Sequence, residues 1–95
     1  MTGYVALVHK DAGTSYGVSF PDVPGCISAG DTMDEALANA AAALAGHLAL
    51  MRADGDTIPM PRTLGAIKAD PESASDLEGA AVRIVEPAEP LAHAR

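Results

Sequence analysis

Aromatic residues, cysteine and basic residues are all scarce in this 95-residue chain. It has no tryptophan, and Tyr4, Tyr16 and Phe20 are its only large aromatic residues, so its core must rest on Val, Leu, Ile and Met. Cys26 is the only cysteine, which excludes an intramolecular disulfide and suits a reducing compartment. The 6 basic and 13 acidic residues give a net charge of -7, which argues against binding nucleic acid or an anionic membrane and favours a basic partner.

Long hydrophobic runs are also missing. The N-terminus has neither a basic region nor a long apolar stretch, so we expect no signal peptide. Residues 36–51 come closest to a membrane span, but they are mostly alanine and are interrupted by Asn39, Gly46 and His47. A chain of this length supports one core. We therefore expect a soluble, cytoplasmic protein with one domain over residues 1–87 and a flexible tail over residues 88–95.

Three segments in the first 30 residues have the composition of strands. Residues 4–10 are rich in β-formers on both faces, and Gly13 marks a turn after them. Residues 15–20 alternate, with Tyr16, Val18 and Phe20 on one face, as in a half-buried antiparallel strand. Residues 26–29 are long enough for a short third strand.

Proline and glycine separate these segments. Pro21 has no N–H for a sheet ladder and ends the second strand. Pro24 and Gly25 form a strong turn signal, because proline presets φ and glycine accepts φ > 0. Gly30 closes the third strand. Together with Phe20, Thr32 and Glu35, these residues make the stretch over residues 20–36 a structural scaffold.

A long helix is predicted over residues 33–54. Thr32 and Glu35 fit a capping box, with Glu35 reaching back to the helix start. Alanine is the best helix former, and Gly55 is placed to end the helix. One apolar stripe follows the helical period: Leu37, Ala41, Leu44, Leu48 and Met51.

The rest of the chain predicts an extended connector, a short helix and a final strand. Two prolines keep residues 56–62 extended, and Thr63 can cap a short helix over residues 63–69. Residues 72–79 are small and polar, which indicates a loop, and residues 80–85 read as a last strand. The expected fold is α+β: two layers in the order β-β-β-α-β, a small, mostly antiparallel sheet, and one long helix on one face.

Three carboxylates are candidates for contacts with a partner: Asp22, Asp31 and Asp34. Each also has an ordinary structural explanation. Asp22 follows Pro21 and suits an Asx turn, and Asp31 suits a turn before the helix. Asp34, like Glu35, lies where the helix dipole favours an anion.

Catalytic and metal sites are not expected. A two-metal nuclease needs several converging carboxylates, but residues 4–10 carry none, and Asp11 lies in the turn that follows. Cys26 is not paired by spacing with His9 or His47, and a small buried cysteine is common in cores. The histidines, including His93, have no metal-ligand spacing, and we expect His47 on the solvent side of the helix. No cofactor is predicted.

A combination of motifs over roughly residues 4–61 resembles the HicB antitoxin family. Any single piece would be uninformative, but together they form a fairly specific pattern. The matching pieces are Phe20-Pro21-Asp22-Val23-Pro24-Gly25-Cys26, Gly30-Asp31-Thr32, Asp34-Glu35-Ala36, Asn39-Ala40 and Ile58-Pro59-x-Pro61.

The resemblance implies a partial ribonuclease-H-like fold and inhibition rather than catalysis. A HicB-like protein binds a small basic HicA toxin, which has a double-stranded-RNA-binding-type fold and cleaves mRNA with a histidine, and blocks access to it. Exposed strand edges would allow a homodimer or a higher homo-oligomer. Many relatives carry a C-terminal DNA-binding segment; residues 86–95 are too short for one and contain Pro87 and Pro90, so DNA binding is not expected. The alternatives are a stand-alone binding or regulatory module without a toxin and, less favoured, a metal-dependent nuclease.

Overall fold

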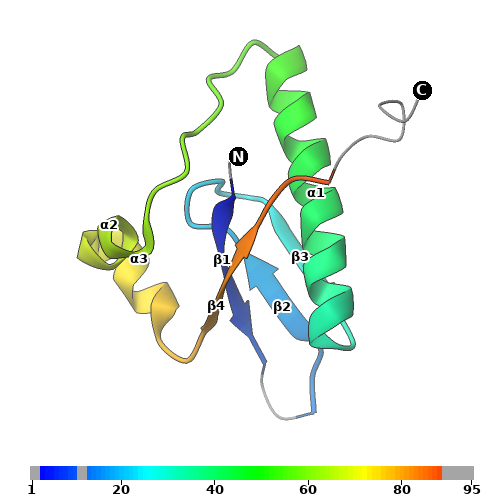
Figure 1. The fold of residues 1–95 in the computed structure, drawn as a ribbon, viewed down its shortest axis with the longest axis vertical. Coiled ribbons are helices and arrows are strands. Elements are labelled where there is room, and N and C mark those ends of the chain that lie inside the picture. Colours follow the sequence, from blue (N-terminus) through cyan, green and yellow to red (C-terminus); the bar gives the residue numbers. More distant parts are fainter. Residues whose placement is uncertain (1–2, 11–12, 89–95) are drawn as a thin grey trace.

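A four-stranded antiparallel sheet with the order β3-β2-β1-β4 lies at the centre of the structure (Figure 1). The computed structural model describes residues 3–10 and 13–88. The elements in chain order are β1 (Tyr4–His9), β2 (Tyr16–Ser19), β3 (Ile27–Gly30), α1 (Met33–Ala53), α2 (Leu64–Ala69), α3 (Pro71–Ala74), the 3-10 turn η1 (Ser75–Leu77) and β4 (Ala81–Val85). The expected α+β fold is confirmed. Asp11, His93 and, apart from Ala88, the expected tail lie outside the described residues.

The central strand β1 is buried on both faces, as its two-sided apolar sequence predicts. Tyr4, Ala6 and Val8 belong to the core cluster beneath α1. Val5 and Leu7 point to the opposite face, where they pack with Ile67 of α2 in a second cluster. A strand with period-2 side chains can supply two cores only if both faces of the sheet are covered next to it.

Residues on β2 follow the predicted alternation. Val18 and Phe20 are buried against α1, and Tyr16 packs at the margin of the same cluster. The register pairs Val8 with Val18, which keeps the apolar residues of both strands on one face.

Helix α1 begins and ends as the sequence predicts. The Thr32 hydroxyl accepts a hydrogen bond from the Glu35 N–H at 3.1 Å. Glu35 reaches back one residue further than expected and accepts from the N–H of Asp31 at 3.1 Å. At the other end the N–H groups of Gly55 and Asp56 return to the carbonyls of Arg52 and Met51, which is a Schellman motif with Gly55 at φ +81°.

The buried face of α1 combines small and large residues. Ala36, Ala40, Leu44 and Leu48 are buried, while Leu37, Ala41 and Met51 of the predicted stripe lie beside them and are partly buried. By length and mean hydropathy alone α1 would also suit a membrane span, which the interrupted sequence had not led us to expect. Its one-sided burial against the sheet is the arrangement of a core helix.

A second helical layer covers part of the opposite sheet face, and one expectation here was wrong. Thr63 caps α2 as predicted, accepting from the Ala66 N–H at 3.1 Å. Residues 72–79 are not a loop, because α3 and η1 occupy most of them. Asp70 caps α3, Pro71 takes its first position and Glu72 accompanies them in the first turn. The sequence Asp70-Pro71-Glu72 is therefore a helix-start signal, but the small polar residues that follow it are typical of a loop.

Gly30 is the last residue of β3, where the strand passes directly beneath the start of α1. A Cβ atom at this position would lie 2.4 Å from the backbone N of Ala36. The contact is backbone against backbone, so a flexible side chain could not relieve it. Gly30 therefore permits the close packing of α1 on β3 as well as ending the strand.

A pair of glycine substitutions tests this role. We expect Gly30→Ala to lower the free energy of unfolding by about 2 kcal/mol or more, since the new methyl group overpacks the helix–strand contact. Gly46→Ala is the matched control, because Gly46 is exposed on α1 and nothing lies within 4 Å of its added Cβ. It should raise stability by about 0.5–1 kcal/mol through helix propensity. Urea unfolding of both variants measures the difference; equal effects would contradict the close approach.

Candidate partner-binding surface

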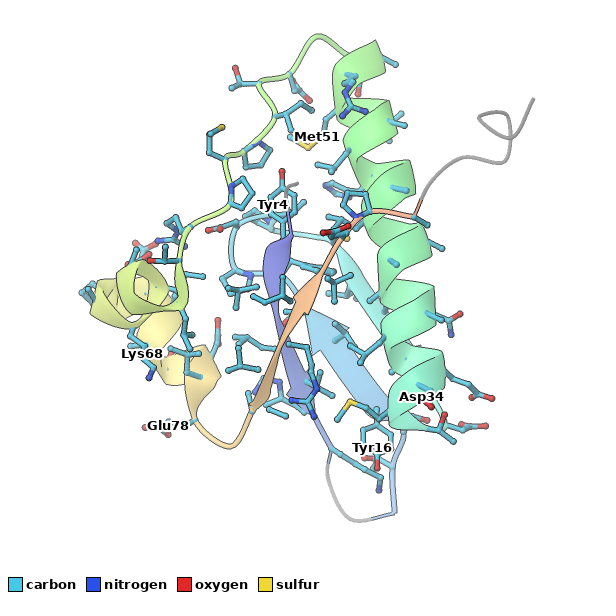
Figure 2. The ribbon with its side chains drawn as sticks, in the orientation of Figure 1. Tyr4, Tyr16, Asp34, Met51, Lys68 and Glu78 are labelled. Carbon is cyan, nitrogen blue, oxygen red and sulfur yellow. The ribbon has the colours of Figure 1, made fainter. Side chains whose placement is uncertain are left out.

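Two of the three predicted contact carboxylates lie together at the start of α1. Asp31 and Asp34 are exposed, and with the exposed Glu35 they form what we call the acidic corner. Figure 2 shows Asp34 in the first turn of α1, directed away from the sheet. Glu35 is held by its bond from the Asp31 N–H, whereas Asp34 is available to solvent. The corner therefore presents negative charge at the end of β3.

The segment before the corner is a pair of consecutive tight turns, as its prolines and glycine predict. The Val23 N–H donates to the Phe20 carbonyl and the Cys26 N–H donates to the Val23 carbonyl, both at 3.1 Å. Pro24 and Gly25 occupy the centre of the second turn, with Gly25 at φ +89°. Pro21 and Asp22 are the central residues of the first turn, and Phe20 and Val23 on either side of them are buried in the core.

Asp22, the third predicted carboxylate, is enclosed within the fold and binds Arg62. Its side chain is only 4% exposed. Its two oxygens accept from the backbone N–H of Arg62 at 2.6 Å and from the Arg62 Nε at 2.5 Å. The expected Asx turn is therefore wrong, because the donors come from a residue 40 positions away. Asp22 therefore fastens the connector after α1 to the turns that follow β2.

The same arginine joins a second carboxylate. Arg62 Nη1 donates to the Asp70 Oδ2 at 3.0 Å. Asp70 also accepts from the Glu72 N–H at 3.0 Å and from the Ser73 hydroxyl at 3.3 Å. The Arg62 guanidinium, followed by the Glu72 N–H, holds the pKa of Asp70 below its usual value.

Sequence reasoning missed this Asp22–Arg62–Asp70 clasp. The cap formed by Asp70 is readable from Asp-Pro-Glu, but nothing local pairs Arg62 with Asp22. The clasp borders Tyr4, whose hydroxyl donates to the Pro59 carbonyl at 2.6 Å. Burial, and then the negative charge of Asp22, raises the pKa of Tyr4.

The residues considered for catalysis are buried, hydrogen-bonded or partly covered. Cys26 is buried, and burial raises the pKa of its thiol, which disfavours the nucleophilic thiolate. The His9 Nε2 lies 2.9 Å from the Asp76 carbonyl oxygen. His47 is half-buried next to Gly25 rather than on the solvent side. Over residues 3–10 and 13–88, no group of three His, Cys, Asp or Glu side chains is placed to hold a metal ion.

A surface that the sequence did not suggest lies on the sheet face opposite α1. The second helical layer covers β1 and Val82 of β4 there but leaves β2, β3 and Ile84 of β4 open. Ile27 is 71% exposed on this open half, and two hollows adjoin it. An exposed apolar side chain beside a hollow is a candidate for contact with a partner.

Comparison with known proteins identifies relatives over nearly the whole described chain. The family model of the HicB-like antitoxin of bacterial toxin-antitoxin systems matches residues 4–88. An uncharacterised 14.9 kDa protein of Haemophilus phage HP1 is 52% identical over 44 residues, which are 46% of this chain and 33% of the phage protein. This chain thus spans about a third of that curated relative.

Solved structures agree with the family match. The antitoxin HicB of Burkholderia pseudomallei has a TM-score of 0.74 and 36% identity, over 90% of this chain and 63% of that one. Its isolated N-terminal domain is covered completely, with a TM-score of 0.73, 34% identity and 93% of this chain. A chain of the HicA3 and HicB3 toxin-antitoxin complex has a TM-score of 0.69 and 27% identity, over 90% of this chain and 96% of that one.

The clasp generates a prediction about stability. We expect Asp22→Ala to lower the free energy of unfolding by about 1–3 kcal/mol, because it leaves a partly buried backbone N–H without an acceptor. Asp22→Asn should cost less, since the amide oxygen can still accept that bond. Asp56→Ala, at an exposed carboxylate, should stay within about 0.5 kcal/mol of the parent chain. Urea unfolding checks the order; an Asp22→Ala variant as stable as Asp56→Ala would show that the clasp contributes nothing.

The lowered pKa of Asp70 predicts a pH dependence. The folded state favours the carboxylate, so its contribution is complete above the unfolded pKa of about 3.9 and disappears as the pH falls through the lower folded value. We expect Asp70→Asn to be less stable than the parent at pH 7 and the difference to narrow below about pH 4. Thermal unfolding across pH 3–7 measures it. A difference that is constant over this range would contradict the assignment.

Proposed function

Because the chain belongs to the HicB-like antitoxin family, we propose that it binds a small basic mRNA-cleaving toxin of the HicA type and neutralises it by covering it. The observation that carries the proposal is the similarity to a chain of the HicA3 and HicB3 complex, which extends over 96% of that chain. The net charge of -7 supports it, since opposite charge accelerates association with a basic partner.

The acidic corner is our proposed entry point for the toxin's positive charge. Asp31 and Asp34 are exposed there and free to face a partner. Asp22, the third carboxylate first considered, is nearly enclosed and bound by Arg62, so we assign it to the clasp and leave it out of the proposed contacts.

Several finer features belong to the same proposal. Residues 1–87 form one domain with a partial ribonuclease-H-like fold. This domain works in the cytoplasm and inhibits its partner without catalysing a reaction. Homo-oligomers would form through the β4 edge, where Ile84 is 64% exposed; light scattering at several concentrations tests this. Metal-dependent RNA cleavage by the purified chain, abolished by Asp31→Ala, would contradict the non-enzymatic role.

Co-expression tests the function directly. The toxin to test is a small basic protein encoded in a neighbouring frame. Its expression alone should arrest growth, and this chain should relieve the arrest and co-purify with it. Failure of both would refute the antitoxin function. If no such neighbouring frame exists, the stand-alone binding module is favoured.

A charge-matched pair of variants tests the acidic corner. We expect the double substitution Asp31→Asn and Asp34→Asn to slow toxin association severalfold at low salt, because long-range attraction acts mainly on the association rate. Asp54→Asn with Asp56→Asn removes the same charge at the opposite end of α1, where both residues are exposed. Stopped-flow or surface-binding kinetics at two salt concentrations compares them. Equal slowing by both pairs would mean that only net charge matters.

A further inference from the structure

The uncovered half of the sheet has an unusual floor. On the face opposite α1, β2 contributes Gly17 and Ser19, which are small, and β3 contributes Ile27, which is paired with Ser19. The pairing of Leu7 with Ser19 fixes this orientation, because Leu7 points into the core beneath α2. A large exposed apolar side chain therefore stands on a floor of small residues.

Two hollows meet at this floor. One, of about 310 Å³, lies between the turns after β2 and the α3–η1 segment; the other, of about 270 Å³, extends over β2 and β3 towards His9. Ser19 and Ile27 line both hollows, so we treat them as one open-face groove. Gly17 and Ser19 form its floor, Ile27 projects from this floor, and Glu72 and Asp76 form its wall. The bond between His9 and the Asp76 carbonyl holds that wall against the end of β1.

The groove is negatively charged. Glu72 and Asp76 are exposed, and no Lys or Arg lines either hollow. Among residues 3–10 and 13–88, neither carboxylate forms an ion pair. A second copy of this acidic chain would bring like charges together there, and nucleic acid would be repelled. The chemistry fits a segment with an apolar side chain flanked by Lys or Arg.

The free edge of β3 is less suited to a partner than its face. The Asn39 amide of α1 donates to the Ala29 carbonyl at 2.9 Å and so occupies an outward-facing group of this edge strand. Pairing of a foreign strand along β3 would have to displace that bond, whereas the groove is open. Figure 1 shows the α3 segment and α1 on opposite sides of the sheet, with β3 near α1.

We propose that the open-face groove is the docking site for a basic segment of the toxin, with Ile27 as the apolar anchor and Glu72 and Asp76 as the charged wall. This inference rests on the proposed antitoxin function. It also agrees with the acidic corner, since Ile27 begins β3 and Asp31 directly follows it, four residues or about 13 Å further along an extended chain. One small domain can contact both.

Matched variants test the groove with the purified toxin from the neighbouring frame. Ile27→Lys, and separately Glu72→Lys with Asp76→Lys, should each raise the Kd at least about tenfold, as expected for a central contact. The controls are Leu50→Lys, at a similarly exposed apolar residue on α1, and Asp54→Lys with Asp56→Lys, which makes the same change of charge elsewhere. The controls should stay within about threefold of the parent. All altered side chains are exposed, and circular dichroism and Tm confirm folding.

The outcomes separate the groove from the function on which it depends. If the parent chain binds and neutralises the toxin but the groove variants bind equally well, the antitoxin function stands and the groove is refuted. If controls and groove variants weaken binding alike, the effect is one of overall charge, and the groove is also refuted. If the parent chain neither binds nor relieves toxicity, both proposals fail.

Discussion

The close approach of α1 to β3 is the contact on which the rest of the structure depends. Gly30 lets the backbone at Ala36 come so near that no side chain fits between them. Small residues continue this contact through Ala40, and Leu44 and Leu48 fill the wider space beyond. The helix is thereby fixed over one sheet face, where Phe20 and Val18 complete the core. Because this chain has few large aromatic side chains, it packs closely by bringing the helix and sheet backbones together rather than by filling a wider space with large side chains.

The opposite face is closed only in part, and the clasp determines which part. Arg62 binds Asp22 in the turns after β2 and Asp70 at the start of α3, so the connector leads α2 over β1 and the neighbouring part of β4. Ile67 then packs on Val5 and Leu7 of β1. The other half, around Ile27, stays uncovered. Asp22 is buried and holds the connector in place, whereas Asp31 and Asp34 are exposed and, in our proposal, contact the toxin.

Local signals predicted the parts of the fold that depend on local physics. The Thr32 cap, the Gly55 end, the Pro24–Gly25 turn and the alternation through Val18 were all confirmed. The short helix α3 was missed although Asp70-Pro71-Glu72 is a readable start, since the small polar residues after it resemble a loop. The helix stripe was placed slightly off the buried face, because alanines along α1 offer little contrast between its faces.

The sequence by itself determined the element order, the two-sided burial of β1 and the family, since these rest on periodicity, caps, turns and a combination of short motifs. Only the tertiary structure decided what each carboxylate does. Asp22 and Asp31 look alike in sequence, yet one is enclosed by Arg62 from 40 residues away and the other faces solvent. Long-range pairings of this kind leave no local periodicity. The open-face groove is decided in the same way, because Ile27 and Asp76 become neighbours only when the connector folds across the sheet.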